Sequence, residues 1–150
     1  MTTTTTATAD SEIRAFLDSW QQAVDARDLP ALMAHYTPDV IAYDAILALQ
    51  FEGREAYGRH WQACLDLCPG PMHFSRHGLR IAAAGDVGYC HALVRCGGVD
   101  AEGREDAHWT RMTAGLRRVD GRWRIAHEHY SAPFDIATMK VLDLTPDAVP

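Results

Sequence analysis

Apolar residues recur every three or four positions in the first third of the chain, and this spacing predicts amphipathic helices. The first helix is predicted to begin at Asp10 or Ser11 and to run to about residue 26. Asp28 is predicted to cap a second helix over residues 29–35, and a third is predicted over residues 54–67, before a Pro-Gly-Pro stop. The apolar stripe of the first helix consists of Ile13, Phe16, Leu17, Trp20 and Val24.

From residue 72 onward the apolar period changes to two, which is typical of β-strands. A shorter strand is predicted earlier, over residues 40–44, and a loop with a strand fragment follows it before Gly53. Short connections, including the Asp120-Gly121 turn, predict antiparallel neighbours. Helices followed by a run of antiparallel strands predict an α+β fold. The four later strands are predicted over residues 72–83, 87–99, 107–118 and 122–130.

Two short runs carry candidate chemistry. Strand side chains alternate faces, so His127 and His129 are predicted to share a face with the apolar Trp123 and Ile125, as in the wall of a partly polar cavity or in a hydrogen-bonded core. Asp44 ends the apolar face of the earlier strand, where a carboxylate either meets water or works inside a pocket. Both alternatives remain open from the residues alone.

Composition narrows the class of protein. The chain has 150 residues, 47% of them hydrophobic and 23% charged, which suits one globular domain. Its net charge of -6 argues against a nucleic-acid partner, and no apolar run approaches the roughly 18 residues of a membrane span. The threonine-rich start lacks the features of a secretion signal, so a cytoplasmic location is expected. Residues 1–9 are expected to be a disordered tail, residues 10–134 the domain and residues 135–150 a C-terminal extension with a short helix over residues 136–141.

The sequence contains no convincing motif for a bound metal or cofactor. His60, Cys64 and Cys68 fall on one face of the third helix, but they lack close pairing and a fourth ligand, so a buried helix face is favoured over zinc. Phosphate loops, dinucleotide fingerprints and the Gly-x-Ser-x-Gly motif do not occur. We therefore expect no metal and no cofactor.

Several local strings resemble the nuclear transport factor 2 (NTF2)-like superfamily, in particular its ketosteroid isomerase-like and SnoaL-like branch. The resemblance covers roughly residues 11–134. The strings are Trp20-(x7)-Asp28-Leu29, Tyr36-(x2)-Asp39-Val40-(x3)-Asp44, Gly53-Arg54-Glu55-Ala56, Gly85-Asp86-Val87, Arg111-(x)-Thr113 and Gly121-Arg122-Trp123-Arg124-Ile125-(x)-His127-Glu128-His129-(x)-Ser131.

This resemblance implies a cone, in which three N-terminal helices pack on a curved antiparallel sheet that encloses an apolar pocket, and a homodimer formed through the sheet. Asp44 falls where ketosteroid isomerases hold their base, Trp20 at their oxyanion tyrosine and Thr113 near their protonated aspartate. A branch that resembles scytalone dehydratase instead uses an Asp–His pair, for which Asp25 and His73 are the candidates.

The expected function is cofactor-independent proton transfer on a small, mostly apolar, cyclic or aromatic substrate, giving isomerisation, elimination or cyclisation. Asp44 is the expected base, His129 and His127 the proton shuttle, and Arg111 the positive partner if its strand face points inward. The alternative is a non-catalytic ligand-binding or assembly module, since the last strand also resembles the association domain of a calmodulin-dependent kinase. The residues expected to bind substrate are Trp20, Tyr43, Trp61, His73, Trp109 and Thr113.

Overall fold

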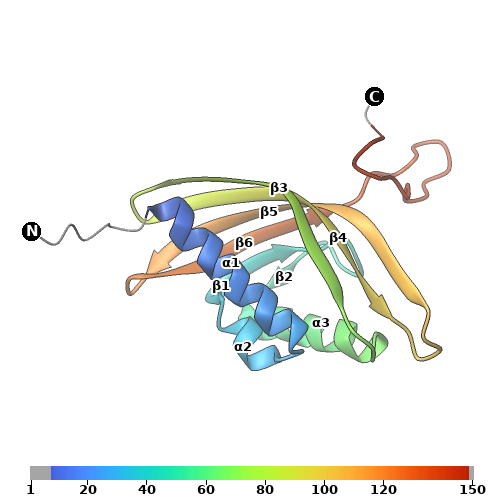
Figure 1. The fold of residues 1–150 in the computed structure, drawn as a ribbon, viewed down its shortest axis with the longest axis horizontal. Coiled ribbons are helices and arrows are strands. Elements are labelled where there is room, and N and C mark those ends of the chain that lie inside the picture. Colours follow the sequence, from blue (N-terminus) through green and yellow to red (C-terminus); the bar gives the residue numbers. More distant parts are fainter. Residues whose placement is uncertain (1–7, 149–150) are drawn as a thin grey trace, which may run out of the picture.

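Three helices precede most of the sheet in the computed structural model, which describes residues 8–148 (Figure 1). Helices α1 (Ala9–Asp25) and α2 (Leu29–Met33) are followed by strands β1 (Tyr36–Tyr43) and β2 (Phe51–Glu52). Helix α3 then occupies the range that the sequence predicted. The remaining bounds are α3 Arg54–Leu67, β3 His73–Ala84, β4 Val87–Val99, β5 Glu105–Val119 and β6 Arg122–Ser131.

The helix starts show one confirmed cap and one that differs. Asp28 caps α2 as predicted, since its carboxylate accepts the backbone N–H of Ala31 at 3.0 Å. Helix α1 is capped by Thr8, whose hydroxyl accepts the N–H of Ser11 at 3.2 Å. Asp10, one of the two predicted caps, lies inside the first turn instead. Thr8 and Ala9, which the sequence assigned to a disordered tail, form this cap and the first turn, and residues 1–7 lie outside the part of the chain that the structure describes.

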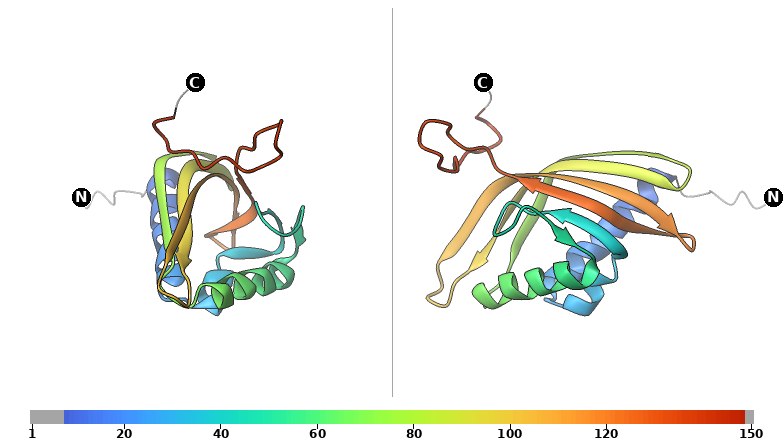
Figure 2. Two further views of the ribbon diagram at one scale, coloured as in Figure 1. Left: turned by 90° about the vertical axis from the view of Figure 1, so that its right-hand side faces the viewer. Right: turned by 180° about the vertical axis from the view of Figure 1, so that it is seen from behind.

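The six strands form one sheet in the order β2-β1-β6-β5-β4-β3. All neighbouring strands are antiparallel except β1 and β6, which pair in parallel. The prediction of an antiparallel sheet is therefore wrong for this one pair. β1 is joined to β6 only through the rest of the fold, and therefore no hairpin constrains their direction. The sheet arches over the helices, which cover its concave side (Figure 2).

A β-bulge in β6 reverses the predicted facing of its histidines. Leu116 of β5 pairs with Ile125 and the preceding Gly115 pairs with His127, so Ala126 is an extra residue in β6. Because a strand alternates faces at every residue, one insertion moves all later side chains to the opposite face. His127 and His129 consequently do not share the face of Trp123 and Ile125, and that prediction was wrong.

The same bulge turns Glu128 and Tyr130 inward, where they are 2% and 8% exposed. They join a core between the helices and the concave face of the sheet. Its largest completely buried side chains include three aromatic residues, Trp20, Tyr36 and Tyr57. Burying such side chains supplies most of the stabilisation of a domain of this size.

The segment after β6 does not form the predicted helix over residues 136–141. An antiparallel bridge joins Phe134 to Val141, and Asp135 accepts the backbone N–H groups of Ala137 and Thr138 within a turn. An aspartate that bonds the next residues' amides favours a turn over a helix interior. Within residues 8–148, no helix has the length and apolar character needed to cross a membrane.

Candidate functional site

Asp44 follows the inner face of β1, as predicted. Val40 and Ala42 on that face are completely buried, and the Asp44 side chain keeps 19% of its surface exposed at the rim. Its Oδ2 atom lies 2.9 Å from Nε2 of His60 on α3. The end of β1 and the middle of α3 thus bring a carboxylate and an imidazole together in partly buried surroundings.

His60 lies deeper than Asp44, with 3% of its side chain exposed. Phe51 stacks on its ring at a centroid distance of 4.1 Å, and the Sγ atom of Cys64, one helical turn later, lies 3.8 Å from its Nε2. Burial by itself lowers the pKa of His60, but the hydrogen bonds and charges of Asp44 and Cys64 outweigh it and raise the pKa to about 9. His60 is therefore an imidazolium at neutral pH, paired with the Asp44 carboxylate.

A second carboxyl group, Glu128, lies at the centre of a buried hydrogen-bond network. Tyr57 and Tyr36 both donate their hydroxyls to its Oε1 atom, the latter at 3.0 Å. Trp20 in turn donates its indole N–H to the Tyr36 oxygen at 2.9 Å. Desolvation raises the pKa of Glu128 to about 7, although the two tyrosine hydrogen bonds oppose the rise. The negative charge of Asp44 adds to it.

The two predicted shuttle histidines lie on the convex face of the sheet. The Tyr43 ring packs edge-on against His127 at 4.7 Å and against His129 at 5.4 Å. His127 also donates from Nδ1 to the carbonyl oxygen of Ile41 at 2.7 Å. Neither imidazole forms a hydrogen bond with Asp44 or His60 among the described residues, although His129 lies beside the same rim as Asp44.

Three further predicted residues also lie on the convex face, along β5. Arg111 is exposed, and its Nε donates to the Ser131 hydroxyl at 3.0 Å. Trp109 packs against His77 at 4.7 Å, and Thr113 is exposed next to His129 in the strand register. Arg111 was predicted to be the positive partner of Asp44 only if its strand face points inward. In the structure this face points outward, so Arg111 does not have that role.

Trp20 and Trp61 point inward, as expected, but both are packed into the core. They are 1% and 8% exposed, and their rings meet edge-to-face at 5.8 Å. The Trp61 indole nitrogen is buried and has no hydrogen-bond partner among the described residues. The Trp61 donor is therefore unsatisfied inside the core, one residue after His60 in α3.

Asp25 and His73, the alternative Asp–His pair, both line a groove between α1 and β3. No hydrogen bond joins them in the described part of the chain. Asp25 accepts from the Gln21 amide at 2.9 Å, and His73 lies 3.7 Å from Glu105. Asp25 and His73 are therefore not in contact with each other, whereas Asp44 and His60 are.

A hollow of about 670 Å³ lies at the rim beside Asp44, within the range of small-molecule sites. Tyr43 and His129 form part of its wall, and the loop of residues 44–50 forms the rest. Leu47 and Leu49 of this loop are 80% and 94% exposed. An apolar body bound here would cover these side chains and would lie next to the Asp44 carboxylate.

Sequence reasoning missed His60 and Glu128 as site residues. His60 carried a signal, because it shares the inner face of the third helix with Tyr57 and Cys64. The sequence contains no signal for Glu128, because regular alternation places its side chain outward and only the bulge turns it inward.

The two raised pKa values predict that stability falls as the pH rises. A group whose pKa is higher in the folded state binds more protons there, so its contribution to stability is complete at low pH and disappears above the folded pKa. For Glu128 the loss is about 2 kcal/mol between about pH 5 and 7, and for His60 it is similar between about pH 7 and 9. Urea unfolding at a series of pH values measures the free energy of unfolding of wild type, Glu128→Gln and His60→Gln. Glu128→Gln should remove the loss of stability between about pH 5 and 7, and His60→Gln the loss between about pH 7 and 9.

His35 has the opposite effect on the pH dependence of stability. Burial lowers its pKa despite hydrogen bonds to two carbonyl groups, so its contribution to stability grows as the pH rises. The difference between wild type and each variant cancels this contribution. Parallel pH curves for wild type and Glu128→Gln would contradict the raised pKa of Glu128.

A curved sheet wrapped over three helices, with polar groups on its concave side, defines the NTF2-like class of folds. Among solved structures, an NTF2-like protein of unknown function from Pseudomonas putida KT2440 is 47% identical, with 92% of this chain and 96% of that chain covered and a TM-score of 0.84. A protein proposed to be a calcium/calmodulin-dependent protein kinase II association domain, from Xanthomonas campestris, is 18% identical over 87% and 91% of the chains, with a TM-score of 0.76. A ketosteroid isomerase-like protein from Erwinia carotovora atroseptica SCRI1043 is 17% identical over 80% and 92%, with a TM-score of 0.67.

The model of the SnoaL-like domain matches residues 13–135. The chain therefore belongs to the SnoaL-like family, which confirms the resemblance inferred from its motifs. A comparison with curated proteins finds no match.

Proposed function

We propose that the protein is a cofactor-independent proton-transfer enzyme, an isomerase, lyase or cyclase that acts on a small, mostly apolar, cyclic or aromatic molecule. The observation that carries the proposal is the 2.9 Å contact between Asp44 and His60 beside a hollow of about 670 Å³. A fixed base next to a fixed acid, at the edge of an apolar site, is the arrangement that abstraction of a carbon-bound proton requires.

Asp44 acts as the base in this proposal, because its carboxylate is the partly exposed member of the pair. His60, with its pKa raised to about 9, is protonated at neutral pH; from its buried position behind Asp44 it orients the carboxylate and stabilises the negative charge that develops on the substrate. The buried Glu128 network lies behind this pair and holds Tyr57 in place on α3. In this proposal His60, and not His129 or His127, is the imidazole that acts with Asp44.

Exchange of carbon-bound hydrogen for deuterium tests the proposal without knowledge of the natural substrate. A panel of cyclic enones and aryl ketones is incubated in D2O with catalytic amounts of protein, and proton NMR follows the loss of the signal next to the carbonyl. We expect at least one member to exchange at least about 100-fold faster than in buffer. Exchange at the buffer rate across the whole panel would contradict the proposal.

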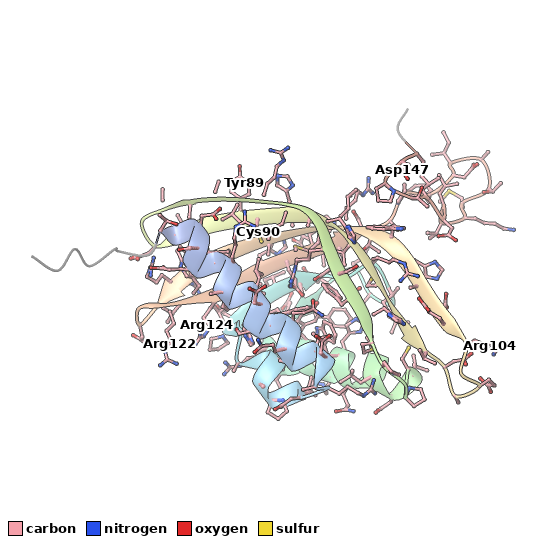
Figure 3. All side chains as sticks on the ribbon, in the orientation of Figure 1. Tyr89, Cys90, Arg104, Arg122, Arg124 and Asp147 are labelled. Atoms are coloured by element: carbon pink, nitrogen blue, oxygen red, sulfur yellow. The ribbon has the colours of Figure 1, made fainter. Side chains whose placement is uncertain are left out.

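A second candidate function is assembly through the convex face of the sheet, with a homodimer as the product. Apolar side chains of β4 are unusually exposed on this face: Val87 by 60%, Tyr89 by 53% and Leu93 by 40%. Figure 3 shows Tyr89 directed away from the helices, whereas its neighbour Cys90 is buried beneath the strand. A second copy of the sheet would cover these side chains.

Size-exclusion chromatography with light scattering measures the predicted dimer, whose mass is about twice the 16.6 kDa of the chain. Leu93→Glu places a charge on the convex face and should give a monomer. Leu67→Glu is the matched control, because Leu67 on α3 is 72% exposed and lies away from the sheet. A wild-type protein that remains monomeric at high concentration would exclude this interface.

A further inference from the structure

A groove of about 770 Å³ separates α1 from β3, which lie side by side (Figure 1). Its apolar lining comes from Leu17, Met72, Phe74 and Leu79. This volume is that of a small-molecule site. Asp44 and His60 do not contribute to its walls, so the groove is distinct from the proposed proton-transfer site.

Arg76 is the one of the groove's three arginines that forms no ion pair within residues 8–148. Arg14 pairs with Asp10 at 2.7 Å, and Arg95 pairs with Glu105 at 2.8 Å. The Arg76 Nε atom is buried without any hydrogen-bond partner. Buried polar atoms without partners are rare in folded proteins, and a bound water, an ion or a ligand is one explanation for such an atom.

The surroundings hold Arg76 in place without neutralising it. Its guanidinium lies 4.8 Å from the centroid of the Trp20 ring and 5.4 Å from that of Phe74. Stacking on aromatic faces orients a guanidinium and attracts it weakly, but it does not satisfy its N–H groups. The carboxyl group of Glu128 gives only a partial counter-charge, because its pKa of about 7 leaves it partly protonated at neutral pH.

The other charged groups of the groove leave room for an anion at Arg76. Asp18 and Asp25 line the groove from α1 but are exposed to solvent, and His73 lies 3.7 Å from Glu105. None of these carboxylates forms an ion pair with Arg76 among the described residues. An oxygen anion with a planar pair of acceptors would match the guanidinium fork and would provide the acceptor that Nε lacks.

We propose that the groove binds a small carboxylic acid, with its carboxylate on Arg76 and its apolar body on Leu17, Met72 and Phe74. The bound acid supplies the hydrogen-bond acceptors that Arg76 lacks, and it covers the apolar lining between α1 and β3. This site does not depend on the chemistry of Asp44, and its test requires no activity.

Isothermal titration calorimetry with phenylacetate and its neutral amide, phenylacetamide, tests the proposal. We expect phenylacetate to bind with a Kd below about 10 mM and the amide to bind at least about tenfold more weakly, because only the acid pairs with the guanidinium. Arg76→Gln should abolish this difference. Arg95→Gln, which changes an arginine of the same groove that already has a partner, should retain it.

Equal affinity for the acid and the amide, or the absence of phenylacetate binding, would overturn the proposal. If Arg76→Gln does not fold, methyl NMR of the wild-type protein gives the answer. Phenylacetate is then expected to shift the methyl signals of Leu17 and Met72. Shifts confined to Leu47 and Leu49, in the loop beside Asp44, would show that the acid binds elsewhere and would also overturn the proposal.

Discussion

Replacement of Asp44 by asparagine is expected to lower the deuterium-exchange rate at least about 100-fold, with little change in melting temperature. The amide has nearly the shape of the carboxylate but cannot accept a proton from carbon. Its side-chain oxygen can still meet His60 Nε2, which lies 2.9 Å from the native carboxylate. Exchange kinetics on the most responsive ketone, together with thermal unfolding of the same samples, measure both quantities.

Two variants serve as controls for Asp44→Asn. Asp39→Asn alters an exposed carboxylate on the same strand, which pairs with Arg117 at 3.0 Å. His91→Gln alters an exposed imidazole on the convex face, where it stacks on Tyr89 at a centroid distance of 6.4 Å and does not line the hollow. Both should retain exchange rates within about twofold of wild type, as expected of residues outside the reacting pair. Retention of more than a tenth of the activity by Asp44→Asn would remove Asp44 as the base.

Replacement of Glu128 by alanine is expected to lower the free energy of unfolding by about 3–5 kcal/mol. The change leaves the hydroxyls of Tyr36 and Tyr57 without their common acceptor and opens a cavity where the side chain is 2% exposed. For a domain of this size the melting temperature should fall by about 10 °C. Urea unfolding followed by tryptophan fluorescence measures the change.

Glu128→Gln separates the hydrogen bonds from the charge, because its amide keeps an oxygen acceptor for both tyrosines. It should cost about 1 kcal/mol near pH 7, where the native carboxyl is itself partly protonated. Glu55→Ala provides the surface control, since Glu55 is 92% exposed in its pair with Arg59 and should contribute less than about 0.5 kcal/mol. Equal stability of wild type and Glu128→Ala would show that the network does not stabilise the fold.

Local patterns were sufficient to predict most elements of the fold. The third helix has the predicted bounds, and the strand over residues 87–99 does as well, because an amphipathic period and a clear stop signal mark both. The strand pairs joined by tight turns were also antiparallel as predicted. The parallel pairing of β1 with β6 joins residues far apart in the sequence, and no local signal specifies such a contact.

In the candidate site, too, local patterns predicted some residues correctly, whereas contacts between distant segments decided others. Asp44 was predicted because β1 is regular beyond Val40, so alternation placed its side chain on the inner face. The facing of His127 and His129 was predicted wrongly because Ala126 is an extra residue in the pairing with β5. A bulge depends on which strand lies alongside, and therefore a count of alternating residues does not reveal it.

The sequence by itself determined the helices, the strands, the α+β class and the family resemblance, since these follow from side-chain period and short motifs. The tertiary structure alone decided which imidazole meets Asp44 and which carboxyl group is buried. His60 approaches Asp44 because α3 packs against the end of β1, and Glu128 enters the core because β6 shifts its register against β5. Both contacts depend on packing between distant segments, whereas a period in the sequence records only how neighbouring residues share a face.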